Sequence, residues 1–253
     1  MRAYAGLLLK PVLLLTIILT FIGFAVIPSR KILSSDSLNN KKPNQQQAIN
    51  SLKVNNKAGR LEVVSVERKG QSIRLQFKNN YSKTINAYVL SPGGYQVIYE
   101  LEDKDFIPPG GTHERSINVQ RGQIEDRINI MAVVFDDKTG DGDSAAIKEI
   151  KDLRLGRKIQ LNRIIPYLDS ILKSTDATLS QSLQNVRIKI NNLPIGSEQE
   201  FPHHVLVGLR DIRETALKSL EELDQVRRDS GNDIFMQQLA KLRALFLKEI
   251  EKY

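Results

Sequence analysis

The chain has 253 residues, no cysteine, and a formal net charge of +8 at pH 7. The lack of cysteine excludes a disulfide framework, a thiolate metal site, a cysteine nucleophile and a lipid-anchored N-terminal cysteine. The basic excess lies in residues 1–60, which hold nine Lys and Arg against one acidic residue, whereas residues 61–253 hold 28 of each sign. A neutral C-terminal part lacks the electrostatic footprint of a nucleic-acid binder, so we expect no nucleic-acid partner.

An uncharged apolar run, Val12–Ile27, follows Lys10 near the N-terminus. Its length of about 16 residues is below the ~20 that span a bilayer, but a start at Ala5 with a snorkelling Lys10 makes a span long enough. We therefore expect the membrane to be contacted through residues 5–27, within an uncleaved signal-anchor over 1–28. Two alternatives stay open, namely a signal peptide cleaved after Ala25 and a buried core helix.

Residues 29–60 are predicted to form a disordered basic tether. They are rich in Asn, Gln, Ser and Lys and contain no aromatic residue, so they bury too little apolar surface to offset the entropy of ordering. A short N-terminal tail followed by a long downstream chain favours a single-pass protein with extracytoplasmic C-terminal domains. Cleavage of the leader would instead give a secreted protein.

From Leu61 onward the apolar residues recur with a period of two, which is typical of half-buried strands. Turn residues such as Arg68–Gln71 and Ser91–Gly94 separate the runs. The last run, Ile128–Phe135, has the β-branched content and length of a buried strand. Six or seven short strands separated by turn residues predict an antiparallel β-sandwich over residues 61–142.

Several segments within residues 61–170 resemble uncharacterised bacterial exported or membrane-anchored proteins that carry an immunoglobulin-like or fibronectin-like sandwich module. The segments that carry the resemblance are Phe77-Lys-Asn-Asn80, Ser82-Lys-Thr-Ile85, Pro109-Gly-Gly-Thr112, Val134-Phe-Asp-Asp-Lys-Thr-Gly-Asp-Gly-Asp143 and Arg157-Lys-Ile-Gln-Leu-Asn-Arg-Ile-Ile-Pro166. The resemblance implies an immunoglobulin-like fold and an extracytoplasmic setting. It implies no catalytic residue.

The acidic, glycine-rich stretch 136–143 is expected to be neither helix nor strand, and it is the best candidate for a metal site. Numbered as an EF-hand loop from Asp137, it has Lys148 where a bidentate Glu is required, which argues against an EF-hand. An irregular Ca²⁺ site formed by Asp137, Asp141 and Asp143 stays open. The alternative is a turn whose carboxylates lie at the positive end of the next helix.

Residues 143–253 show the helical period and predict an antiparallel helical bundle. The first helix is expected to be capped by Asp143 or Ser144, weakened at Gly156, and kinked or broken at Pro166. Its first half, including Ile150, is expected to pack on the sandwich and its second half in the bundle. Three further helices are expected to begin after Asp176, at Phe201-Pro202, and at a cap formed by Asp233.

Four tyrosines of the strand region, Tyr81, Tyr88, Tyr95 and Tyr99, are the candidates for an exposed aromatic surface that binds a partner. The alternative is that they pack at sheet edges and rims. His113 is alone on a predicted strand edge. The sequence contains no phosphate-binding glycine loop, nucleophile elbow or HExxH motif.

These features together predict an α+β protein with an N-terminal membrane helix, an antiparallel immunoglobulin-like sandwich and a C-terminal antiparallel helical bundle. The expected function is that of a non-enzymatic, membrane-anchored extracytoplasmic binding or scaffold protein, whose partner is another protein or an envelope component. Apart from Ca²⁺ in the acidic loop, no cofactor is expected. The alternative is an accessory or regulatory subunit of an envelope enzyme, or a hydrolase without a recognisable motif.

Overall fold

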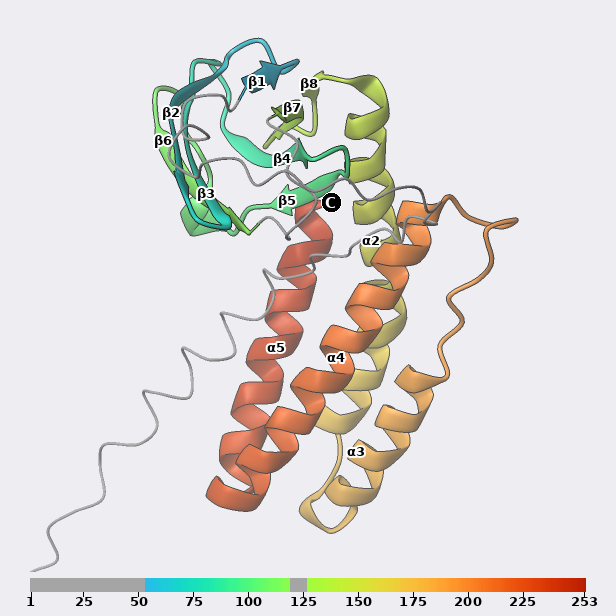
Figure 1. The fold of residues 1–253 in the computed structure, drawn as a ribbon. Coiled ribbons are helices and arrows are strands. Elements are labelled where there is room, and N and C mark those ends of the chain that lie inside the picture. The colour runs from blue at the N-terminus through green and yellow to red at the C-terminus, as the bar shows by residue number, and fades with distance from the viewer. Residues whose placement is uncertain (1–52, 119–126) are drawn as a thin grey trace, which may run out of the picture. The chain divides into compact units, whose positions relative to one another are not determined.

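The structure, a computed structural model, describes residues 53–118 and 127–253. These residues form a mixed α+β fold with two β-sheets and four long helices (Figure 1). They divide into two compact units, one ending at Ile150 and the other running from Lys151 to the C-terminus. The predicted membrane anchor and residues 29–52 of the predicted tether lie outside the described residues. No helix within the described ranges is both long and apolar enough to cross a membrane.

The strand unit contains two sheets, here called sheet A and sheet B. Sheet A has the order β1-β7-β4-β5 with β8 also paired to β7, and sheet B has the order β2-β3-β6. The strands are β1 (Lys53–Asn56), β2 (Leu61–Lys69), β3 (Ser72–Asn79), β4 (Ile85–Pro92), β5 (Val97–Glu100), β6 (Thr112–Asn118), β7 (Arg127–Phe135) and β8 (Gly140–Gly142), with a short 3₁₀ helix, η2, at Asp103–Asp105.

Two of these strands correct the sequence analysis. Residues 53–56, assigned to the tether, form β1, and β1 pairs with β7 in parallel, so the sheets are not wholly antiparallel. Residues 140–142, assigned to an irregular loop, form the short strand β8 against β7. Both strands are too short and too polar to show an apolar period, so the sequence pattern does not reveal them.

The two sheets share one apolar core. Sheet B contributes Leu75 and Phe77, and sheet A contributes Tyr88, Leu90 and Ile130, all of them fully buried. The rings of Phe77 and Tyr88 meet across the core with centroids 5.5 Å apart. The predicted alternation therefore identifies the inward-facing residues of β3. It is wrong for β4, where the predicted Ala87 and Val89 lie in a separate cluster and Tyr88 and Leu90 face the core between the sheets.

Strands β4 and β7 are buried on both faces. Ala132 and Val134 of β7 point away from the core between the sheets and pack with Ala146 and Ile150, in the first two turns of helix α2 (Ser144–Leu172). This confirms the prediction that Ile150 packs on the strands. Burial on both faces also explains why the run Ile128–Phe135 is continuously apolar rather than alternating.

A β-bulge at Met131 arranges the two faces of β7. Val89 pairs with Ala132 and Leu90 with Ile130, which leaves Met131 as an extra residue on β7. The extra residue shifts the inward and outward positions by one along the rest of the strand.

The second unit is a bundle built from α2 after its first turns, α3 (Asp176–Asn191), α4 (His203–Ser230) and α5 (Asn232–Lys252). Successive helices run in alternating directions, and the segment 192–202 extends alongside α4 where the shorter α3 has ended (Figure 1). One apolar cluster joins all four helices, which confirms the predicted antiparallel bundle. The buried members are Leu161, Ile164, Ile165, Leu168, Ile171, Leu179, Leu183, Val186, Ile190, Leu193, Ile212, Ala216, Leu220, Leu223, Phe235, Leu239, Leu242 and Phe246.

Two details of the helices differ from the predictions. Helix α2 is uninterrupted through Pro166, which lies on its exposed side, so the predicted break is wrong. The N-cap position of α5 is Gly231, with no side-chain cap, whereas Asp233 was predicted to cap it.

Gly156 has a specific packing role that the sequence pattern does not show. A Cβ atom at Gly156 would lie 2.0 Å from the carbonyl oxygen of Val205 on α4, and a Cβ at Gly208 would lie 2.2 Å from the carbonyl oxygen of Leu153 on α2. The two glycines therefore let the backbones of α2 and α4 touch, in a place where any side chain would hold the helices apart.

We predict that Gly156→Ala destabilises the bundle by about 1–3 kcal/mol through overpacking, although alanine is the better helix former by about 1 kcal/mol. Urea unfolding measures the change. Asn162→Ala, at an exposed position of the same helix, is the matched control and should be neutral or slightly stabilising. A Gly156→Ala chain as stable as the control would contradict the close contact.

Candidate functional site

Several polar side chains of the strand unit contact one another near the start of the described chain. They join three parts: the segment Asn56–Leu61, the tyrosine Tyr81, and the acidic loop 136–143. We call this region the N-terminal junction. It contains all three aspartates predicted as calcium ligands and one of the four predicted tyrosines.

Asp143 links the start of the described chain to α2. Its Oδ1 accepts hydrogen bonds from the backbone N–H groups of Ala145 (3.1 Å) and Ala146 (3.3 Å), which confirms the predicted helix cap. Its Oδ2 forms an ion pair with the Lys57 ammonium at 2.9 Å. The Lys57 contact and the helix N–H donors hold the pKa of Asp143 below its usual value. One carboxylate therefore contacts both Lys57, the residue that follows β1, and the first turn of α2.

Asp137 stabilises the turn that leaves β7. It accepts hydrogen bonds from the backbone N–H (3.0 Å) and the hydroxyl (2.5 Å) of Thr139, and it pairs with the Lys83 ammonium at 2.7 Å. Lys83 also donates to the Thr139 hydroxyl. The hydrogen bonds from Lys83 and Thr139 lower the pKa of Asp137 to about 2. The carboxylate is therefore ionised under all ordinary conditions and its oxygens are occupied.

Asp141 and Tyr81 were predicted for separate sites, and the structure brings them together. The Tyr81 hydroxyl lies 2.5 Å from Asp141 Oδ2 and 2.7 Å from the carbonyl oxygen of Ala58, and it accepts a hydrogen bond from the backbone N–H of Arg60 (3.1 Å). Burial, followed by the hydrogen bond to Asp141, raises the pKa of the Tyr81 hydroxyl above its ordinary value. It therefore stays protonated and can donate to either oxygen.

The three aspartates do not converge on a common point in these contacts. Each one is bound to a different donor: Lys83 and Thr139 for Asp137, Tyr81 for Asp141, and Lys57 with the helix N–H groups for Asp143. Within residues 53–118 and 127–253 no group of three or more His, Cys, Asp or Glu side chains is placed to hold a metal ion. The calcium site stays a prediction, and the observed contacts favour the turn-and-cap alternative.

We predict that the thermal stability of the protein is the same in calcium and in a chelator, for the natural chain and for Asp141→Asn alike. Because Asp143 caps α2, Asp143→Ala should lower the melting temperature by a few degrees in both conditions. Differential scanning calorimetry measures these shifts. A calcium-dependent rise in melting temperature that Asp141→Asn abolishes would establish a metal site instead.

Two of the four tyrosines predicted to form an exposed aromatic surface are buried. Tyr88 is fully buried and Tyr99 is 8% exposed, while Tyr81 and Tyr95 are partly buried and pack against the core between the sheets. The rings of Tyr88 and Tyr99 stack with centroids 5.1 Å apart. The alternative prediction, that these tyrosines pack within the strand unit, explains the positions of Tyr88 and Tyr99. A role in partner binding stays a prediction for the partly buried pair.

A polar cluster that the sequence analysis did not identify lies beside these tyrosines. His113 and Arg115, on the edge strand β6, occupy the same face as the buried Ile117. His113 Nε2 lies 3.3 Å from the Tyr88 hydroxyl, and the Arg115 guanidinium stands 4.4 Å from the Tyr99 ring centroid. The period-two spacing of 113, 115 and 117 is the signal that places both residues on the inner face.

His113 is held in its neutral form. Burial lowers its pKa, and Arg115 acts in the same direction, while Asp105 opposes them. A neutral imidazole suits the contact with Tyr88, because burial raises the pKa of that hydroxyl and keeps it protonated. The arrangement places the polar groups of β6 against the tyrosine rings of β4 and β5.

We predict that the strand unit loses stability as the pH falls below about 6.5, the pKa of an unfolded histidine. A folded pKa below the unfolded one means that the unfolded chain binds more protons, so stability is complete above pH 6.5 and declines beneath it. Urea unfolding at pH 7.5, 6.5 and 5.5 measures the slope. His113→Gln should flatten the slope, and the exposed residue His203, replaced by Gln, serves as the control. An unchanged slope in His113→Gln would contradict the assignment.

Two buried charged side chains of the bundle, Arg157 and Asp224, have structural partners. Arg157, 8% exposed, donates from Nε (2.8 Å) and Nη2 (2.7 Å) to Oδ2 of Asp211, one turn from the contact between Gly156 and Gly208. The same guanidinium approaches the hydroxyl of Tyr253 at 3.4 Å. These bonds fix α2 against α4 and the end of α5.

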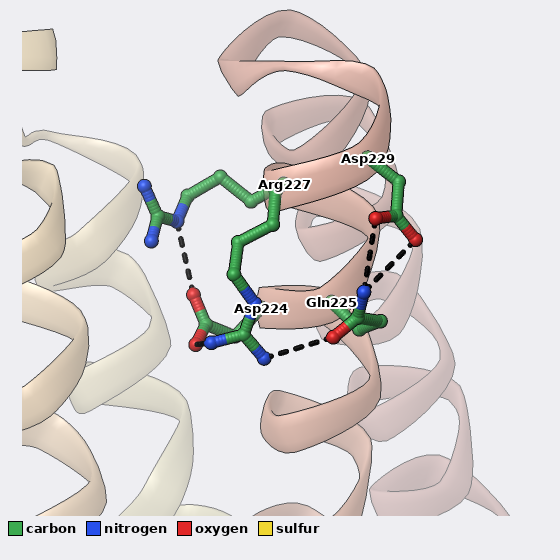
Figure 2. Close-up of polar contacts among 5 residues, drawn as sticks. Asp224, Gln225, Arg227 and Asp229 are labelled. Carbon is green, nitrogen blue, oxygen red and sulfur yellow. Dashed lines mark hydrogen bonds and ion pairs between the residues drawn. The ribbon is translucent and has the colours of Figure 1, made fainter.

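A second network lies at the C-terminal end of α4 (Figure 2). Asp224, 8% exposed, accepts hydrogen bonds from Arg227 Nε and Arg228 Nη1, each at 3.0 Å. Gln225 receives a hydrogen bond from Arg228 and donates to both carboxylate oxygens of Asp229. All the partners are one turn apart, and the two arginines also lie favourably at the negative end of the helix, so the network stabilises the helix end.

No protein-family model, no curated protein and no solved structure matches this chain. The role of the protein is therefore inferred from its sequence and from the contacts within its fold.

Proposed function

We propose that the protein is a membrane-anchored, extracytoplasmic binding or scaffold protein without catalytic activity. The observation that carries the proposal is the order of parts along the sequence: an uncharged run over 12–27, a basic polar stretch, and then a neutral folded part that starts at β1. That order suits a domain held near a membrane by its N-terminus. A partner protein or an envelope component would be bound by the folded part.

The N-terminal junction supports this assignment. The chain coming from the basic stretch joins the sheet as β1, and Lys57, Ala58 and Arg60 are then held by Asp143 and Tyr81. The end of the proposed tether is thereby fixed to sheet A and to the first turn of α2. A tethered domain needs such a fixed attachment so that its other surfaces keep a defined distance and orientation.

The arrangement of the strands supports the finer description of an immunoglobulin-like or fibronectin-like sandwich. Two open sheets share a core, and the chain crosses between them after β1, β3, β5 and β6. Crossing connections of this kind are a feature of Greek-key sandwiches, whose edges and end loops are common binding surfaces. The resemblance to modules of bacterial exported proteins fits the same description.

We predict that the full chain stays in the membrane fraction after high-salt and carbonate washing, because the segment 12–27 is inserted. Because the chain has no cysteine, single substitutions report its orientation. A membrane-impermeant maleimide added to intact cells should label Ser180→Cys, at an exposed position of α3, and should leave Ala3→Cys unlabelled. Permeabilised cells, in which both should react, are the control. Release of the chain by the washes, or labelling of Ala3→Cys alone, would overturn the proposal.

A further inference from the structure

β1 is held to the rest of its unit by few contacts. It pairs with β7 over four residues, and three of its four side chains are exposed, with only Val54 packing against the core. Its side-chain bond to β7 is at the surface, where Asn55 Nδ2 donates to Asn129 Oδ1 at 3.2 Å. Asn56 bonds to the backbone of Ala58 and Leu61, in the connection that follows β1. Local openings with so little buried apolar surface require much less free energy than global unfolding.

The edge of β7 that β1 covers would otherwise expose backbone donors and acceptors. β7 has nine residues, and on this side β1 covers its first half, Arg127–Ile130, while the three-residue β8 covers Ala132–Val134. The face of β7 is buried, so the strand keeps its position when β1 leaves. The vacated segment is then a strand-binding site with one apolar position, the one that receives Val54.

β1 has a single connection to the described fold, and that connection has a clear hinge. Ala58 and Leu61 are fully buried, and the carbonyl oxygen of Ala58 accepts a hydrogen bond from the Tyr81 hydroxyl. Rotation at Lys57 therefore releases β1 while the rest of the unit is unchanged. Three contacts oppose this rotation: the exposed ion pair between Lys57 and Asp143, the hydrogen bond from the Lys57 N–H to the carbonyl oxygen of Ile130 (2.9 Å), and the hydrogen bond from Asn56 Nδ2 to the carbonyl oxygen of Leu61 (2.6 Å).

We propose that β1 exchanges between two copies of this chain, so that the β7 edge of each copy binds the β1 strand of the other. The second copy is the fitting occupant because its β1 offers the same backbone register and the same Val54. A reciprocal exchange also leaves neither edge uncovered. Within one copy the short connection gives β1 a high effective concentration, so exchange becomes favourable only where copies are crowded.

Crowding is what a membrane anchor provides, and in this respect the inference rests on the proposed function. Confinement to a surface raises the local concentration of β7 edges around each β1. The exchanged form should therefore increase with the surface density of the protein, whereas the amount of β1 paired within one copy should decrease.

The absence of natural cysteine makes the exchange directly measurable. Asn55 and Asn129 are register partners, so a cysteine at each forms a disulfide when β1 lies on β7. Two full-length chains with different tags, one Asn55→Cys and the other Asn129→Cys, are produced together in the same membranes and oxidised. We expect a mixed disulfide whose yield rises with expression level, and a higher yield when Lys57→Ala is added to both chains. Asn55→Cys paired with Ser116→Cys, at an exposed position of sheet B, measures random collision.

The double variant Asn55→Cys/Asn129→Cys in one chain tests the pairing itself. It should form an internal disulfide at low expression. An internal disulfide without any mixed disulfide above the collision control would overturn the exchange, and failure of the internal disulfide would overturn the pairing on which the exchange depends. Membrane fractionation is read on the same samples, so a mixed disulfide in a chain released by carbonate would refute the anchor and support the exchange.

Discussion

The strand β7 is the constraint on which the strand unit depends. It is the only described strand that pairs with three others, β1, β4 and β8, and its two faces contribute to two apolar clusters. A strand buried on both faces must be covered twice, here by sheet B on one side and by the first turns of α2 on the other. The bulge at Met131 allows β7 to pack against α2, because it turns Ala132 and Val134 toward Ile150.

The polar contacts follow from the same strand. The chain leaves β7 through an acidic loop, and this loop lies beside the segment that connects β1 to β2, so their charges are neutralised locally. Lys57, Lys83 and Tyr81 engage one aspartate each. Exposed ion pairs of this type contribute little free energy individually. Their value is positional, because they fix where the chain enters and leaves the sheet.

Much of this fold could be predicted from the sequence, since long periodic segments report which faces are buried. The four helices, the cap at Asp143 and the buried run of β7 were identified in this way. Features that depend on tertiary neighbours were not. Gly156 reads as a weak point in a helix until the backbone of Val205 is seen against it. Likewise Tyr81 and Asp141 are 60 residues apart, and no local pattern indicates that they meet.

The inward-facing residues of β6 have a consequence for how two molecules of this protein can meet. β6 is an edge of sheet B, and a flat apolar edge would let sheets of neighbouring molecules join indefinitely into fibrils. His113 and Arg115 place polar groups on the inner face of that edge, against Tyr88 and Tyr99. Inward-pointing charged residues at an edge strand disfavour the addition of a further strand. The residues that complete the core at β6 therefore also make this edge unlike the flat apolar edges at which sheets join.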